Sequence, residues 1–70
     1  MIVIKCNLKA LMDAQSISQE LLKQQTGVSA TTIRRYYNND FSRLDCASII
    51  KICTYFKVDL GQMFFFQNLS

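Results

Sequence analysis

A tight turn around Gly27 separates two short stretches of helical periodicity, an arrangement that few small folds accommodate. Gly27 can adopt the left-handed backbone conformation that stops a helix abruptly. Ser18 and Ser29 each precede one of the two stretches, and serine is a favoured N-terminal cap. The sequence therefore predicts a helix over 19–25, a turn, and a second helix over 30–37.

Apolar periodicity predicts three further helices on either side of this pair. Leucine and methionine recur at three- and four-residue spacing over 7–15, which indicates an amphipathic helix. After a connecting loop over 41–44, Asp45 is expected to cap a strongly apolar helix, and Asp59 a last short turn over 60–64.

The two ends of the chain each contain a strand-like run, 1–5 and 64–67, and these are predicted to form a short antiparallel pair. Side chains alternate between the faces of a strand, so Phe64–Phe66 cannot all point inward, and we expect Phe65 to be exposed. Two explanations for this exposed aromatic stay open, a homodimer contact and packing over the N-terminal strand.

Composition indicates one globular domain over 1–70, since half of the 70 residues are hydrophobic. The net charge of +3 suits a polyanionic partner but also an ordinary basic surface. The three cysteines are scattered, which suggests buried thiols in a reducing cytoplasm. With no histidine, no catalytic constellation and no glycine-rich phosphate loop, we expect no enzyme activity, metal, cofactor or small-molecule ligand, and no membrane segment.

The outward face of the 30–37 helix is the candidate functional surface. Once Ile33 and Tyr36 are directed into the core, small and polar residues remain near its start and two arginines further along. The outward residues are Ala30, Thr31, Arg34, Arg35 and Asn38. Such a face can enter the major groove of DNA, where arginine bridges guanine O6 and N7.

At this point a resemblance becomes specific. The stretches Ser18-Gln19, Thr26-Gly27-Val28-Ser29 and Thr31-Thr32-Ile33 resemble the Xre/Cro-like family of lambda-repressor-type DNA-binding domains. The stretch Arg43-Leu44-Asp45 resembles the compact stand-alone branch of that family, and the similarity spans about 7–66. The resemblance implies an all-α, five-helix lambda-repressor-like helix-turn-helix fold, here with a strand pair formed by the termini.

The resemblance also implies roles for individual residues. Gln19 matches a residue that contacts phosphate and braces the recognition helix, and Asn38 and Arg43 match phosphate-facing and basic positions. Positions that reach base edges are matched by Ala30, Thr31 and Arg35, and backbone or flanking-base positions by Ser29 and Thr32.

Three departures from the family pattern are visible. Lys23 replaces a small alanine between the two helices, Asn39-Asp40 replaces a common Gly-Lys pair, and Ala30 replaces a longer residue. The expected consequences are a slightly altered helix crossing, the loss of one phosphate-facing cation, and one apolar contact in place of an amide.

The predicted function is sequence-specific binding of double-stranded DNA by a transcriptional regulator, a small repressor or autoregulator that uses the 30–37 helix in the major groove. We expect a homodimer through the terminal strands or the Phe64–Phe66 region. The alternative is a protein-interaction module, or an antitoxin-type partner of another protein, on the same fold with weak or no DNA binding.

Overall fold

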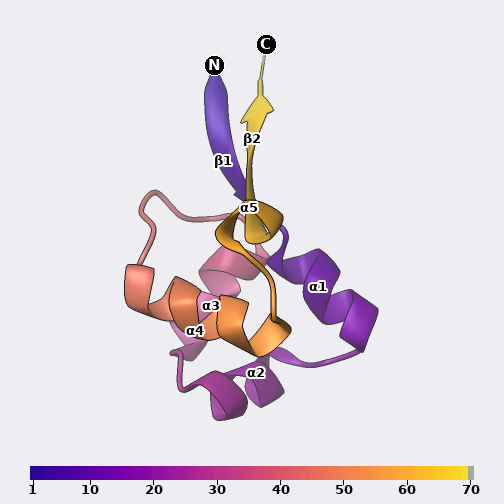
Figure 1. Cartoon of the computed structure of the whole chain (residues 1–70). Helices are drawn as coiled ribbons and strands as arrows, with labels where there is room; N and C mark the ends of the chain where they lie inside the picture. Colours follow the sequence, from indigo (N-terminus) through magenta and orange to yellow (C-terminus); the bar gives the residue numbers. More distant parts are fainter. Residues whose placement is uncertain (70) are drawn as a thin grey trace.

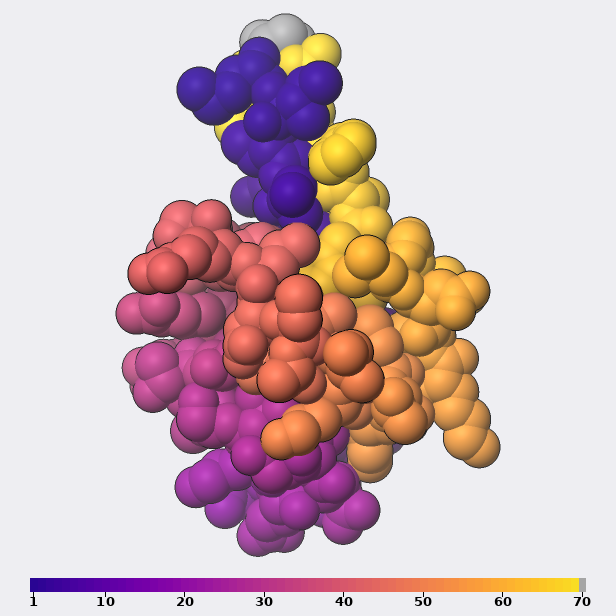
Figure 2. All heavy atoms as spheres, turned by 60° about the vertical axis from the view of Figure 1, so that its left-hand side comes forward, coloured from indigo at the N-terminus to yellow at the C-terminus, as the bar shows by residue number. Residues whose placement is uncertain are grey.

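In a computed structural model that describes residues 1–69, the chain folds into five helices and two strands (Figure 1). The order along the chain is β1 (Ile2–Cys6), α1 (Leu8–Gln15), α2 (Gln19–Thr26), α3 (Ala30–Tyr37), α4 (Cys46–Phe56), α5 (Leu60–Met63) and β2 (Phe64–Asn68). The helices form one body, from which the two strands project as an arm (Figures 1 and 2). The predicted helices and terminal strand pair are confirmed, and the fold is mostly helical rather than strictly all-α.

The predicted caps explain where α2 and α3 begin and end. Ser18 Oγ accepts a hydrogen bond from the backbone N–H of Leu21 at 3.0 Å, and Ser29 Oγ accepts one from Thr32 N–H at 3.2 Å. Gly27 ends α2 with a φ of 75°, in the left-handed region where a side chain is strained. The local sequence therefore fixes the angle at which α3 leaves α2.

Asp45 stands before α4 as expected, but its side chain does not cap the helix. The carboxylate instead accepts a hydrogen bond from the Ser48 hydroxyl, which competes with the backbone N–H groups of the first turn. At the start of α5, the N–H of Asp59 donates to Gln62 Oε1 at 2.8 Å.

The inward faces of the helices and the base of the arm share one apolar core. Its buried members are Cys6, Leu8, Met12, Leu22, Val28, Ile33, Tyr36, Ile49, Ile52, Cys53, Phe56 and Met63. Burial raises the pKa of the Cys6 thiol to about 11 and also raises the pKa of Cys53, so both thiols stay protonated at neutral pH. Cys46 is exposed at the first residue of α4, so the expectation of three core cysteines is wrong for this one.

The arm has a simple antiparallel register, with Ile4 opposite Phe66 and Cys6 opposite Phe64. Directly opposed residues lie on the same face, so Ile2, Ile4 and Phe66 share one face of the arm. Phe65 is exposed as predicted, at 42%, but Phe66 is more exposed, at 76%. The reason is that the arm extends beyond the helical body, which leaves both of its faces in contact with solvent (Figure 2).

Asn39 holds the base of β1 against the end of α3. Its Oδ1 accepts a hydrogen bond from Cys6 N–H at 2.6 Å, and its Nδ2 donates to Cys6 C=O at 3.3 Å. Asn39 has a φ of 57°, a conformation that asparagine tolerates better than most residues. On the other side of the arm, Asn7 N–H donates to the carbonyl of Met63 at 2.7 Å. Both strands are thereby fixed to the body at their roots.

We expect Asn39→Ala to lower the free energy of unfolding by about 2–4 kcal/mol, because it removes two hydrogen bonds and disfavours the positive φ. Asn39→Gly removes the same bonds but accepts the backbone conformation, so it should cost less. Urea denaturation followed by circular dichroism measures both variants. A loss below about 0.5 kcal/mol in each would show that the Asn39 side chain does not hold the arm.

Candidate nucleic-acid interface

The helix α3 presents a polar face to solvent because its apolar residues are fixed in the core. Ile33 and Tyr36 are only 0% and 3% exposed. The exposed residues on the outward side are the predicted ones, Ala30, Thr31, Arg34, Arg35 and Asn38. None of these is acidic, so the face as a whole is suited to a negatively charged surface.

The N-terminus of α3 is held by a pair of hydroxyl groups. The Ser29 hydroxyl donates to Thr32 Oγ1 at 3.0 Å while its oxygen accepts the Thr32 N–H. The capping bonds therefore use the Ser29 proton and leave the Thr32 hydroxyl proton as a donor. The positive end of the helix dipole also lies here, and it favours an anion.

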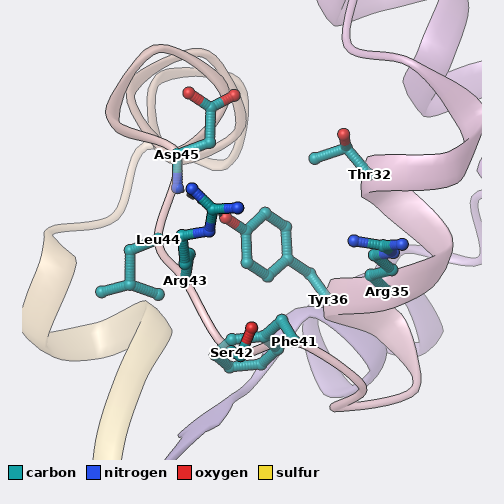
Figure 3. A pocket seen from close by; sticks show the side chains of 8 residues that line it. All are labelled: Thr32, Arg35, Tyr36, Phe41, Ser42, Arg43, Leu44 and Asp45. Carbon is teal, nitrogen blue, oxygen red and sulfur yellow. Dashed lines mark hydrogen bonds between the residues drawn. The ribbon is translucent and has the colours of Figure 1, made fainter.

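A hollow of about 430 Å³ lies between α3 and the loop that precedes α4. Its lining residues are Thr32, Arg35, Tyr36, Phe41, Ser42, Arg43, Leu44 and Asp45 (Figure 3). Arg35 enters from α3 and Arg43 from the loop, and in Figure 3 the Tyr36 ring lies between them. Guanidinium groups on two sides of a concave surface match the geometry of a phosphate oxyanion.

Tyr36 determines the position of the loop relative to α3. Its hydroxyl oxygen accepts a hydrogen bond from Asp45 N–H at 2.9 Å. Its ring packs edge to face against Phe41, with ring centroids 5.1 Å apart. Because these contacts fix both ends of the loop, Arg43 is carried by a backbone that is tied to α3.

Residues 7–68 match the family described as the Cro/C1-type HTH DNA-binding domain. The chain belongs to this family. The match covers all five helices and β2 and leaves β1 outside. No curated protein sequence matches the chain. Family membership supports a DNA-binding regulator whose partner is double-stranded DNA, in agreement with the resemblance seen in the sequence.

Two other classes of function find little in the structure of this Cro/C1-type domain. Among residues 1–69, no group of three or more His, Cys, Asp or Glu side chains could hold a metal ion. Within the same residues, no helix has the length and apolar character needed to cross a membrane.

The domain brings only some of the predicted site residues together. Thr32, Arg35 and Arg43 line the hollow. The other outward residues of α3 lie along the helix outside it, and Gln19 is half-buried at the start of α2, also outside it. Ser42 lines the hollow but was not predicted, because a loop residue has no periodicity that would mark its direction.

The departures from the family pattern have structural explanations at two positions. Lys23 is exposed, so its ammonium stays in water and does not enter the contact between α2 and α3. Asn39 is used to bind Cys6, and the neighbouring Asp40 is exposed. Of the two residues that replace the common Gly-Lys pair, Asn39 therefore serves the fold.

We expect Tyr36→Phe to release the Asp45 amide while keeping the ring packing, because only the hydroxyl acceptor is removed. Hydrogen exchange of the Asp45 amide, followed by NMR, should accelerate, and the free energy of unfolding should fall by about 1 kcal/mol. Tyr37→Phe removes a hydroxyl one residue further along the same helix and should leave that exchange rate unchanged. Equal exchange at Asp45 in all three proteins would contradict the assigned role of Tyr36.

Proposed function

We propose that the chain is a sequence-specific transcriptional regulator, a small repressor or autoregulator, that inserts α3 into the major groove of DNA. The observation that carries the proposal is the division of α3 into two faces. Ile33 and Tyr36 fix the helix in the core, and Thr31 and Arg35 face solvent. Within a DNA-binding family, this is the geometry of a recognition helix.

The residues of α3 are suited to different parts of the groove. Arg35 can bridge O6 and N7 of a guanine, the most frequent specific contact of arginine. Ala30 and Thr31, near the start of the helix, can approach closely and offer methyl groups to thymine. Arg34 is exposed on the same helix and adds positive charge near the backbone.

Phosphate contacts are assigned to residues that surround the recognition helix. Arg43 and Thr32 face the hollow beside α3, where a phosphate oxyanion can bind between Arg43 and Arg35. Asn38 and Gln19 extend the set to the C-terminus of α3 and the N-terminus of α2. Ser29 contributes by holding the first turn of α3. Such contacts position the domain, and base contacts supply specificity.

We propose further that the regulator acts as a homodimer on a pseudo-palindromic site. The half-sites would then lie about 34 Å apart, one turn of duplex. The exposed apolar residues of the terminal strands and of Phe64–Phe66 support this part of the proposal.

A second candidate function is a protein-interaction module on the same fold, or an antitoxin-type partner. The specific observation in its favour is the exposed, apolar arm. If it holds, Arg34→Ala and Arg35→Ala should leave the binding of a protein partner intact.

The experiment that tests the proposed function is selection from a randomised duplex library by the purified protein, followed by sequencing of the retained DNA. Enrichment of a short inverted repeat is the expected result. Retention of weakly bound, unrelated sequences would reject sequence-specific binding and favour the interaction module.

In the same selection, we expect Arg35→Ala to weaken binding to the selected site by about 1–3 kcal/mol and to relax the preference at one base pair of each half-site. The reason is the loss of the bidentate contact to guanine. The measurement is a comparison of affinities for the four variants of that base pair. A variant that discriminates among them as the parent does would refute the assignment.

Arg43→Ala should weaken binding evenly across sequences, because its proposed contact is to phosphate. The slope of log affinity against log salt concentration should become shallower by about 0.9, the value expected for one phosphate contact. Lys9→Ala, which removes one positive charge from exposed α1, is the matched control and should keep the parental slope. Equal slopes for both variants would exclude Arg43 from the phosphate contacts.

A further inference from the structure

The exposed large hydrophobic side chains of residues 1–69 gather in two adjoining places. One group lies on the arm, and the other on the loop before α4 and on α4 and α5 themselves. The arm carries Met1, Ile2, Ile4, Phe65, Phe66 and Leu69, and the second group is Leu44, Ile50 and Leu60. None belongs to α2 or α3, so these residues serve a surface other than the DNA-facing one.

The second group borders a concave apolar surface, here called the α4–α5 groove. This groove has a volume of about 620 Å³, and its lining includes Leu44, Ile50 and Leu60. Its charged residues are one of each sign, Lys57 and Asp59. A smaller hollow of about 300 Å³ connects Leu44 and Leu60 to the root of the arm at Ile4 and Phe64–Phe66. Groove and arm therefore form one continuous apolar surface.

The arm is the convex counterpart of the groove. Ile2, Ile4 and Phe66 share one of its faces and are 66%, 41% and 76% exposed. No charged side chain of either strand lies on that face, because Lys5 is on the other face, opposite Phe65. A two-stranded ribbon is marginally stable alone in water, so this arm gains much from being covered.

We propose that a second copy of this chain covers this surface, with the arm of each copy lying in the α4–α5 groove of the other. The proposal deepens the homodimer part of the proposed function and rests on it. One convex and one concave apolar surface on the same chain allow two identical contacts related by a two-fold axis. The hollow at Leu44 and Leu60 joins arm to groove, so the axis passes close to it.

The dimensions of the two surfaces agree. A strand of five residues such as β2 is about 17 Å long, and the eleven residues of α4 extend about 16 Å. The apolar face of the arm would enter the groove without burying a charge that lacks a partner, which would otherwise oppose association. Neither hollow is lined by α2 or α3, so both recognition helices stay exposed in the dimer.

The test is the oligomeric state in the absence of DNA, measured by sedimentation equilibrium over a range of protein concentrations. The parent chain is expected to be a dimer. Phe66→Asp places a carboxylate on the arm and Ile50→Lys places an ammonium in the groove. Each should weaken self-association by at least about tenfold. Circular dichroism shows that each variant is folded.

Mixing the two variants provides the sharper measurement. In the mixed dimer, one contact has the parental arm and the parental groove, and the other brings a carboxylate to an ammonium. The mixed dimer should therefore form at concentrations where each variant alone is monomeric. Leu69→Asp, an equal change near the tip of the arm on its other face, is the matched control and should leave the dimer intact.

A monomeric parent chain would overturn the proposal even if it selects a DNA site. A dimer that Ile50→Lys leaves unchanged would also overturn it, since the arms would then associate without the groove, as would a mixture no more dimeric than its components. Conversely, a dimer with these properties that selects no DNA sequence would sink only the proposed function.

Discussion

Tyr36 connects the parts of this small domain on which DNA binding depends. Its ring is buried in the core and packs edge to face against Phe41 and, at 5.8 Å between centroids, against Phe64. Its hydroxyl accepts the N–H of Asp45. One side chain of α3 thereby touches the loop that carries Arg43, the start of α4 and the root of the arm. In a core of this size, a contact shared by so many elements determines their relative positions.

The arm and the recognition helix are also joined through Asn39, and this has a consequence for the electrostatics of the interface. In the register of the arm, the backbone groups of Cys6 point away from β2, because bonded and non-bonded pairs alternate and Leu69 N–H bonds to Met1 C=O. Asn39 satisfies both groups of Cys6. The residue thus serves the arm, and Arg43, across the hollow from α3, supplies positive charge at this end of the interface.

Much of the fold could be predicted because its signals are local. Serine caps, the glycine at the end of α2 and apolar periodicity determine α1 to α4 within a residue or two, and they determine which side of α3 faces outward. The prediction failed where tertiary geometry decides. Phe66 proved more exposed than Phe65 because alternation says which residues share a face, but not that the whole strand leaves the body. Ser42 entered the hollow through the long-range contacts of Tyr36, which no short-range pattern encodes.

The two surfaces of the domain follow from the limits of its core. A chain of 70 residues buries a modest share of its surface, and here half of the residues are hydrophobic. The apolar side chains that the core cannot enclose lie on the arm and around the α4–α5 groove, away from α2 and α3. In the dimer proposed above, covering them adds stability that depends on protein concentration, since association stabilises only the folded chain. DNA with two half-sites binds the same dimer, so folding, association and DNA binding draw on one set of contacts and strengthen one another by linkage.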